Sequence, residues 1–552
     1  MIPVRADAGT TSRRQEPPGP RLPLRWALPV ALGGGLALAA AFPPWGVWPL
    51  AAVGPALLTV ALSGRSLRAS FVTGLVFGIA FYVPLVSWVI NLAWYAWIAL
   101  AVASALLLAV LAVGQRLLLR LPAPSWPVAV AGWWVAAEAL RDRWPFGGFP
   151  WGRLAMSQAG TPAQGWAAIG GAPLLTFVVA LVGGTLGWLL LTLLAARPGQ
   201  AADRRRLAWA VLAFAATVGL AVLPAVLPLD PVPRGTPTAE VAAIQGDVPR
   251  ERSLAAQNND EMVTLNHAVA TEKLAAQVKD GRKPAPDLVI WPENSTNIDP
   301  TLYAPVYDEI AGAAAAIDRP ILVGALLQDP ERNAGLLWLP AKGPVAMYVK
   351  RQLVPFGEYI PFRGLISKIT SLTQLDPVNM VPGHSNYIFH VGQIRLGDVI
   401  CYEIGFDALV RSDVTDGANL LAMQTNDATF ERAGILTAET GQQLAMARIR
   451  AVEFDRAVVV ASTTGYSAII APDGRIITSS GIWQQAELES RVPLVTYTTL
   501  AERVGQWPEY VITALTVLAA GYAAARTVRR PWSPRRPRSG ENPANAEQAP
   551  IN

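Results

Sequence analysis

Long apolar runs separated by short polar turns occupy the chain up to residue 228. Most of these runs approach the roughly 20 residues that an α-helix needs to cross a bilayer. We therefore predict seven membrane spans in this part: Leu24–Phe42, Trp48–Leu62, Phe71–Asn91, Trp94–Leu117, Val128–Leu140, Leu174–Ala195 and Leu207–Leu227. The weakest of them is Val128–Leu140, because it is short and contains Glu138.

Residues 231–499 follow a different pattern, in which apolar runs are short, β-rich and separated by turns, as in a soluble α/β domain. Strands are predicted at Val241–Ile244, Leu288–Trp291, Ile321–Val323, Val345–Val349, Ile394–Cys401, Leu420–Gln424 and Val458–Ser462, and helices at Tyr307–Ile317 and Ala438–Val452. A last apolar run within residues 507–526 predicts an eighth span. The expected fold is a polytopic α-helical membrane domain of about eight transmembrane helices, residues 24–228 and 507–526, plus an α/β domain.

Basic residues indicate how the chain is oriented. Residues 1–23 and 527–552 are rich in Arg and Pro, and we expect a disordered basic leader and tail. Basic turns mark the cytoplasmic side of a membrane. These turns contain Arg65 and Arg68, Arg116 and Arg120, and Arg204–Arg206. An odd number of spans before residue 231 then places residues 231–499 outside the cytoplasm, although Arg141, Arg143 and Arg153 fall on the outer side as exceptions.

Composition supports a membrane protein and excludes other classes. Hydrophobic residues make up 52% of the chain and charged residues only 15%, and 19 Trp residues suit an interfacial aromatic belt. The net charge of +5 does not indicate nucleic-acid binding, because no basic stripe with interleaved aromatics occurs. His267, His384 and His390 lack the spacing of metal ligands, so no metal is expected.

Three polar side chains follow predicted strands in the α/β domain. Cys401 is the only cysteine and stands at a strand end, where nucleophiles are often placed, although a buried cysteine can also be a simple core residue. Pro292 ends a strand and puts Glu293 at the sheet terminus, and Lys350 follows another strand. Taken singly, Glu293 and Lys350 are equally compatible with solvated loop positions. Since sites assemble at the carboxyl ends of strands in α/β sheets, the three together indicate an active site.

The motifs around these residues carry a specific resemblance. Trp291-Pro292-Glu293, then Lys350-Arg351-Gln352-Leu353-Val354-Pro355-Phe356-Gly357-Glu358-Tyr359, then Ile400-Cys401-Tyr402-Glu403 resemble the nitrilase superfamily and, within it, the apolipoprotein N-acyltransferase family. Spans before the domain and one span after it also match this family's layout. The resemblance implies a nitrilase-like αββα sandwich in residues 231–499, as the membrane-embedded branch of the carbon-nitrogen hydrolases.

The resemblance also implies roles for individual residues. Cys401 is the expected nucleophile, Glu293 the general base and Lys350 the group that stabilises the oxyanion. Glu358 is expected to position Lys350, and Tyr402 and Glu403 match family positions needed for activity. The implied donor is a membrane phospholipid, and the implied acceptor is the α-amine of a diacylglyceryl-cysteine apolipoprotein. No cofactor is expected, and the protein is expected to be a monomer of the bacterial cytoplasmic membrane.

The sequence departs from the family pattern at Leu254, Thr429 and Gln443, where Trp, an aromatic residue and His are common. These departures concern how donor and acceptor are held. Separately, Phe362, Leu365 and Ile366 belong to apolar residues at helical spacing within residues 361–372. They predict either a short helix packed on the domain's own core or a segment at the membrane surface that admits the lipid donor.

Two other functions are compatible with parts of this pattern. A membrane-anchored amidase or nitrilase that hydrolyses a small amide or nitrile would use the same three residues, but it has no need of so many spans. A transporter with an outer ligand-binding domain would need charge within the membrane, but such charge is sparse, with Glu138 as the main candidate, and this weakens the alternative.

Overall fold

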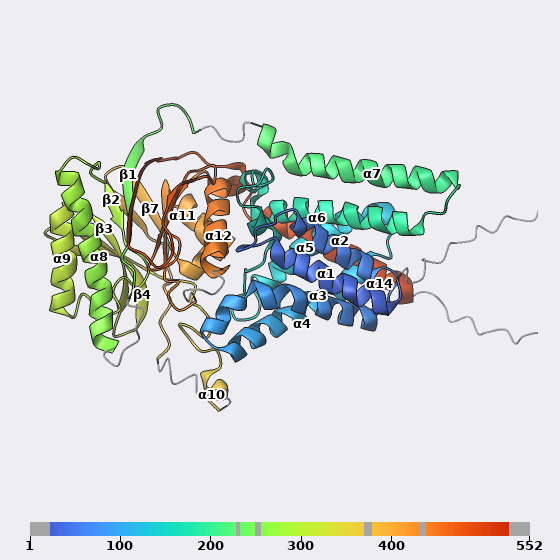
Figure 1. Ribbon diagram of the computed structural model, residues 1–552, viewed down its shortest axis with the longest axis horizontal. Helices are drawn as coiled ribbons and strands as arrows, with labels where there is room; N and C mark the ends of the chain where they lie inside the picture. The colour runs from blue at the N-terminus through green and yellow to red at the C-terminus, as the bar shows by residue number, and fades with distance from the viewer. Residues whose placement is uncertain (1–21, 228–231, 249–255, 369–377, 431–437, 529–552) are drawn as a thin grey trace, which may run out of the picture.

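The computed structural model describes residues 22–227, 232–248, 256–368, 378–430 and 438–528. The predicted leader and tail lie almost wholly outside these residues, as does Leu254. Figure 1 shows two parts side by side, an α/β sandwich and a bundle of helices.

The helical bundle contains a helix at each of the eight predicted spans. They are α1 (Leu24–Ala40), α2 (Leu50–Leu62), α3 (Leu67–Leu85), α4 (Trp94–Leu118), α5 (Trp126–Arg141), α6 (Trp166–Ala195), α7 (Ala201–Val222) and α14 (Trp507–Val528). Among the described residues, the helices long and apolar enough to cross a membrane are α3, α4, α6, α14 and α7 together with the residues that extend it to Val226. Helices α1 and α2 are apolar but shorter. A multi-helix membrane part is therefore confirmed, while the number of full crossings stays a prediction.

Helix α6 begins eight residues before the predicted span, and a break near its start separates these first residues from the rest of the helix. Gly170 and Gly171 have non-helical backbone angles, and Gly171 has φ 71°, a conformation that side chains other than glycine rarely adopt. A Cβ at Gly171 would also lie 2.7 Å from Oε1 of Glu453 in the α/β part. The break thus lets the first turns of α6 lie against the sandwich.

The α/β part is built on two six-stranded sheets. The first has the order β12-β1-β2-β3-β4-β5 and the second β11-β10-β9-β8-β7-β6. Their bounds are β1 (Thr238–Gln245), β2 (Leu288–Ile290), β3 (Ile321–Leu327), β4 (Arg332–Leu339), β5 (Gly343–Val349), β6 (Ile388–Val391), β7 (Ile394–Ile400), β8 (Leu420–Thr425), β9 (Ala457–Ser462), β10 (Ala468–Ile470), β11 (Ile476–Ser479) and β12 (Ala486–Pro493). The expected sandwich is confirmed.

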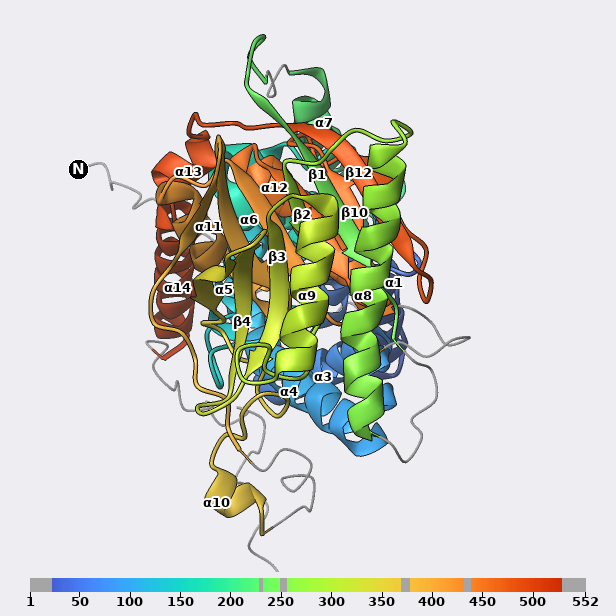
Figure 2. The ribbon, with the colours of Figure 1, turned by 90° about the vertical axis from the view of Figure 1, so that its left-hand side faces the viewer.

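Helices cover both outer faces of this sandwich. Helices α8 (Ala256–Lys279) and α9 (Ala304–Ile317) lie on the first sheet, and α11 (Asp407–Thr415) and α12 (Ala438–Phe454) lie between the second sheet and the bundle (Figures 1 and 2). One cluster of buried apolar side chains runs without interruption from α1–α6 into α12 and strands β7–β10. The bundle and the second sheet therefore share a core, so the second sheet is fixed against the membrane helices.

Several elements were not predicted from the sequence, namely α8, α11, β4, β6 and β10–β12. Strand β12 alternates charged and apolar residues because it is an edge strand paired on one side with β1. Strand β4 is buried along most of its length, and its apolar run is interrupted by Asn333 and Gly335. These strands are specified by their partners in the sheet more than by their own periodicity.

Candidate active site

The carboxyl ends of four strands meet at one edge of the sandwich. Strands β1, β2 and β3 are parallel, and β5 runs in the same direction because β4 is antiparallel to both β3 and β5. In the second sheet, β7, β8 and β9 are parallel. Glu293 follows β2, Lys350 follows β5, Cys401 follows β7 and Asn426 follows β8. The three residues singled out by sequence are thus brought to one place.

Lys350 lies between two carboxylates. Its Nζ donates to Oε1 of Glu293 at 2.9 Å and to Oε1 of Glu358 at 2.8 Å, and Lys350 is only 1% exposed. Asn333 on β4 joins the same two carboxylates, since its Nδ2 donates to Glu293 at 2.7 Å and to Glu358 at 2.9 Å. The backbone N–H of Asn426 donates to Oε2 of Glu293 at 3.0 Å. The ammonium is therefore held in one position from both sides.

Burial sets the protonation behaviour of this group. Burial and the nearby Glu358 charge raise the pKa of Glu293 above its ordinary value of 4.5, although Lys350 opposes the shift. Burial alone would lower the pKa of Lys350, but Glu293 and Glu358 hold it well above 10.5. Burial, followed by the charge of Glu293, raises the pKa of the Cys401 thiol well above 9.0. The resting cysteine is therefore a neutral thiol that needs a base at the moment of reaction.

Cys401 occupies a strained turn. It begins the 3-10 turn η6 (Cys401–Gly405) directly after β7, and its φ of 52° is in the left-handed region, which non-glycine residues seldom adopt. The thiol is 9% exposed, and Nε2 of Gln443 on α12 lies 3.5 Å from its Sγ. This geometry turns Sγ out of the strand and toward the edge where Glu293 and Lys350 lie.

Glu403 fastens this turn to the loop after Lys350. Its Oε2 accepts the backbone N–H of Ile400 at 2.9 Å, and its Oε1 accepts those of Arg351 at 2.7 Å and Gln352 at 3.0 Å. The hydroxyl of Tyr348 donates to the same carboxylate at 3.0 Å. Glu403 is fully buried, and within the described residues it makes no hydrogen bond or ion pair with Lys350 or Glu293. Its structural effect is to hold the two strand ends in register.

Tyr402 points toward the helical bundle. Its ring stacks on Trp151 at a centroid distance of 5.5 Å, and its hydroxyl donates to the carbonyl oxygen of Gly148 at 2.6 Å. Both partners belong to the segment between α5 and α6. The residue after the cysteine therefore anchors the turn to the membrane part.

Buried charges make a second connection between the two parts. Arg153 binds Asp407 through two hydrogen bonds of 2.6 and 2.9 Å and pairs with Asp142 at 3.1 Å. Arg450 on α12 pairs with Asp407 and donates to the carbonyl oxygens of Ile404 and Gly405, each at 3.0 Å. Burial alone would raise the pKa of Asp407, but the two guanidinium groups hold it well below its ordinary value. We call Asp142, Arg153, Asp407 and Arg450 the interface charge cluster.

Specific partners account for the three arginines that did not fit the predicted charge pattern, and only Arg153 belongs to the interface charge cluster. Arg153 pairs with Asp407 at 2.6 Å, Arg143 pairs with Glu509 at 2.6 Å, and Arg141 donates to the hydroxyl of Tyr82 at 2.5 Å. Glu138 accepts the backbone N–H of Leu154 at 2.8 Å and the hydroxyl of Thr176 at 2.7 Å. These contacts give Glu138 a structural function, which weakens the transporter alternative further.

The predicted lipid-access segment is described only in part. Phe362 is 73% exposed and its ring lies 6.0 Å from that of Phe146, which in turn lies 5.9 Å from Phe356. Residues 363–366 form the short helix α10 (Arg363–Ile366), but the side chains of Leu365 and Ile366 and all of residues 369–372 lie outside what the structure describes. The segment therefore contributes an exposed aromatic cluster, and its use stays a prediction.

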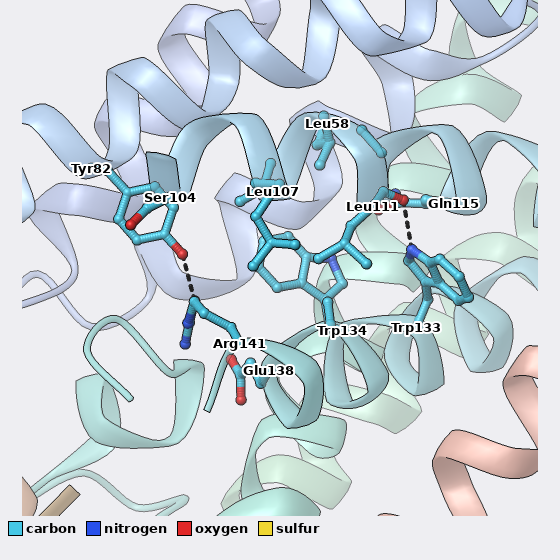
Figure 3. A pocket seen from close by; sticks show the side chains of 13 residues that line it. Leu58, Tyr82, Ser104, Leu107, Leu111, Gln115, Trp133, Trp134, Glu138 and Arg141 are labelled. Atoms are coloured by element: carbon cyan, nitrogen blue, oxygen red, sulfur yellow. Dashed lines mark hydrogen bonds between the residues drawn. The ribbon is translucent and has the colours of Figure 1, made fainter. Parts of the chain in front are cut away.

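A separate space lies within the bundle, between α2, α3, α4 and α5 (Figure 3). Leucines and the rings of Trp133 and Trp134 line it, with Tyr82 and Arg141 at one end and Gln115 at the other. None of the strand-end residues line this space. Within the described part of the chain, no group of three or more His, Cys, Asp or Glu side chains is arranged to hold a metal ion.

Two residues of the site were not identified by their sequence pattern. Asn333 lies in β4, a strand that was not predicted, and only the sheet register brings its amide between two carboxylates. Gln443 was noted as a departure from the family pattern, without any indication that it contacts Cys401. Both follow other polar residues, Arg332 and Gln442, so no local sequence signal marks either of them.

These features define a class: a carbon-nitrogen hydrolase domain attached to a bundle of membrane helices. The carbon-nitrogen hydrolase model matches residues 240–509, and the model of the apolipoprotein N-acyltransferase N-terminal domain matches residues 34–185. The apolipoprotein N-acyltransferase of Mycolicibacterium smegmatis is 38% identical over 531 residues, covering 91% of this chain and 87% of that protein. The chain belongs to the apolipoprotein N-acyltransferase family.

The chain is also similar to a more distant relative and to a solved structure. The apolipoprotein N-acyltransferase of Vibrio vulnificus is 26% identical over 514 residues, covering 88% of this chain and 95% of that protein. A solved amidase from Nesterenkonia sp. AN1 is 18% identical, with a TM-score of 0.36, and covers 51% of this chain and 99% of its own.

Proposed function

We propose that this protein transfers an acyl chain from a membrane phospholipid to the α-amine of the N-terminal diacylglyceryl-cysteine of apolipoproteins. The observation that carries the proposal is the Lys350 ammonium held between Glu293 and Glu358 beside Cys401, which follows a strand of the sheet that shares a core with the membrane helices. Family membership supports the same activity.

The first half-reaction loads the enzyme. Glu293 accepts the Sγ proton while Cys401 attacks the carbonyl carbon of the phospholipid ester. Lys350, together with the backbone amide of Tyr402, stabilises the negative oxygen of the tetrahedral intermediate, an effect commonly worth a few kcal/mol. The intermediate then collapses by breaking the bond between the carbonyl carbon and the glycerol oxygen. Glu293 returns its proton to that oxygen, so a lysophospholipid leaves and a thioester remains on Cys401.

The second half-reaction transfers the chain. The neutral α-amine of the acceptor attacks the thioester carbonyl carbon, and Lys350 again stabilises the oxyanion. Cys401 leaves as a thiolate when the C–S bond breaks, and Glu293 passes the amine proton to it. The overall conversion of ester to amide through the thioester runs downhill, so the chain's own residues suffice without a cofactor.

Access from the bilayer completes the proposal. Phe362 and the cluster it forms with Phe146 and Phe356 expose apolar surface near the Lys350–Tyr359 motif. In our proposal this cluster, with Leu365 and Ile366, faces the outer leaflet of the cytoplasmic membrane, and the donor reaches Cys401 along it. The protein acts as a monomer in this proposal.

The experiment is a two-step transfer by the purified full chain. Incubation with phospholipid adds the mass of one acyl chain at Cys401, and a diacylglyceryl-cysteine peptide then removes it as an amide. Cys401→Ala forms no adduct, and Cys401→Ser forms little because a hydroxyl is far less acidic than a thiol. A protein that hydrolyses small amides but is never acylated by phospholipid is an amidase, and near-normal transfer by Cys401→Ala would refute the mechanism.

A further inference from the structure

The side chain of Gln443 reaches the sulfur of Cys401 from the side of the membrane bundle. It lies on α12, is 2% exposed, and places Nε2 3.5 Å from Sγ. Among the described residues, Gln443 is the one that donates a hydrogen bond to Sγ. Gln443 is therefore positioned to act on the reacting atom itself.

The orientation of this amide is fixed by its neighbours. The same Nε2 donates to Oε1 of Glu439, one turn earlier on α12, and Oε1 of Gln443 accepts the hydroxyl of Thr425 at 2.8 Å. Rotating the amide by half a turn would set its oxygen against the Glu439 carboxylate. One N–H is thus committed to the carboxylate, and the other is left pointing at Sγ.

Most of the charges around Cys401 are negative, so a hydrogen-bond donor to Sγ would stabilise the thiolate. Glu293, Glu439 and Asp427 all disfavour a negative sulfur, and Lys350 is the cation that opposes them. Lys350 already donates to two carboxylates. A neutral N–H stabilises a thiolate without needing a charge of its own, and a hydrogen bond to a charged partner is among the stronger kinds.

We propose that Gln443 is a further catalytic residue, whose amide N–H stabilises the Cys401 thiolate. The inference rests on the proposed function, in which the thiolate appears twice: as the nucleophile that attacks the ester and as the group expelled from the thioester. Gln443 therefore promotes both half-reactions. Thr425 and Glu439 serve as positioning residues that aim its N–H.

The test measures the sulfur directly. Because Cys401 is the only cysteine, the rate of iodoacetamide labelling of the full chain, followed by intact mass against pH, reports the titration of this thiol alone. Gln443→Leu moves the labelling midpoint upward by about one pH unit or more, and slows labelling about tenfold at a pH below both midpoints. Gln443→His restores part of the shift, because the imidazole again offers an N–H.

The chain offers a matched control in the adjacent glutamine. Gln442 is 3% exposed on the same helix, but its Nε2 donates to the carbonyl oxygens of Pro43 and Leu85 in the bundle. Gln442→Leu leaves the midpoint of Cys401 unchanged. An equal shift in Gln442→Leu, or no shift in Gln443→Leu, overturns the proposal.

A double variant separates the lost donor from the field of Glu439. In Glu439→Gln with Gln443→Leu, the carboxylate charge is gone, so an upward shift relative to Glu439→Gln alone comes from the missing N–H. A shift that disappears in this background overturns the proposal. Labelling involves no lipid, so its outcome does not depend on acyl transfer. Failure of acyl transfer would refute the proposed function, whereas the labelling midpoints alone decide whether Gln443 stabilises the thiolate.

Discussion

Replacing Glu403 by Gln tests whether this buried carboxylate sets the geometry of the nucleophile. The carboxylate accepts three backbone N–H groups, from Ile400, Arg351 and Gln352, and so connects the turn of Cys401 to the loop after Lys350. An amide of the same shape has only one acceptor oxygen. In either orientation its NH₂ group faces at least one of these N–H donors.

The structure gives the size of the effect. The most favourable orientation keeps the bonds to Arg351 and Gln352, leaves the buried N–H of Ile400 without its acceptor, and weakens the other bonds by removing the charge. One unsatisfied buried donor costs about 1–3 kcal/mol, so a total near 2–3 kcal/mol is expected for Glu403→Gln. If this loss falls wholly on the productive conformation of the turn, acylation slows by about 30- to 150-fold.

Two measurements check this prediction. Pre-steady-state mass spectrometry gives the rate of acyl-enzyme formation, and thermal unfolding is expected to show a midpoint lower by about 2–5 °C. Asp398→Asn is a matched control, because Asp398 is buried on β7, the strand before this turn, without a hydrogen bond to the turn or to the Lys350 loop within the described residues. Wild-type acylation and stability in Glu403→Gln, or equal losses in Asp398→Asn, would refute the reasoning.

Three further outcomes follow from the charges. Acylation requires ionised Glu293, whose pKa is raised above 4.5 by burial, so the acylation rate falls with decreasing pH at a midpoint above 4.5; a midpoint at or below 4.5 contradicts the role of this base. Burial lowers the pKa of His267 to about 4, so the folded state loses stability as pH falls from about 6.5 through about 4, by at most about 3 kcal/mol. Denaturation of the wild type and His267→Gln at pH 7 and pH 4.5 measures this, and an equal pH dependence in both would exclude His267 as its source. Reporter fusions at Ala341 and Gln200 are expected on opposite sides of the membrane; the same side for both would refute the topology.

The strand-end residues could be predicted because each is marked locally. Pro292 ends a strand before Glu293, and an apolar run ends at Cys401, so neighbours in sequence were enough. The two sheets then bring these ends together as general rules for parallel strands require. The membrane helices were predictable for the same reason, since each is marked by its own apolar run.

The partners of these residues could not be predicted in this way. Asn333 reaches Glu293 through the register of β4 with β5, and Gln443 reaches Cys401 through the packing of α12, 42 residues further along the chain. Neither strand register nor helix packing can be predicted from the residues adjacent in sequence. The arginines that do not fit the predicted charge pattern show the same limit, because the partner of Arg153, Asp407, lies 254 residues further along the chain.

The interface charge cluster has a consequence for how the protein is assembled. Arg153 and Asp407 are 254 residues apart, so the ribosome delivers the arginine long before its partner. Chains emerge N-terminal part first, and until Asp407 arrives the carboxylates of Asp142 and Glu138 pair only with Nε of Arg153, so its two buried Nη groups lack their partner, which is costly. The helices can therefore reach their final packing only after the α/β part has folded and presented Asp407 and the carbonyl oxygens that Arg450 binds. A chain whose catalytic half misfolds keeps its membrane half loose as well, which exposes the whole protein to quality-control proteolysis before an inactive enzyme can accumulate.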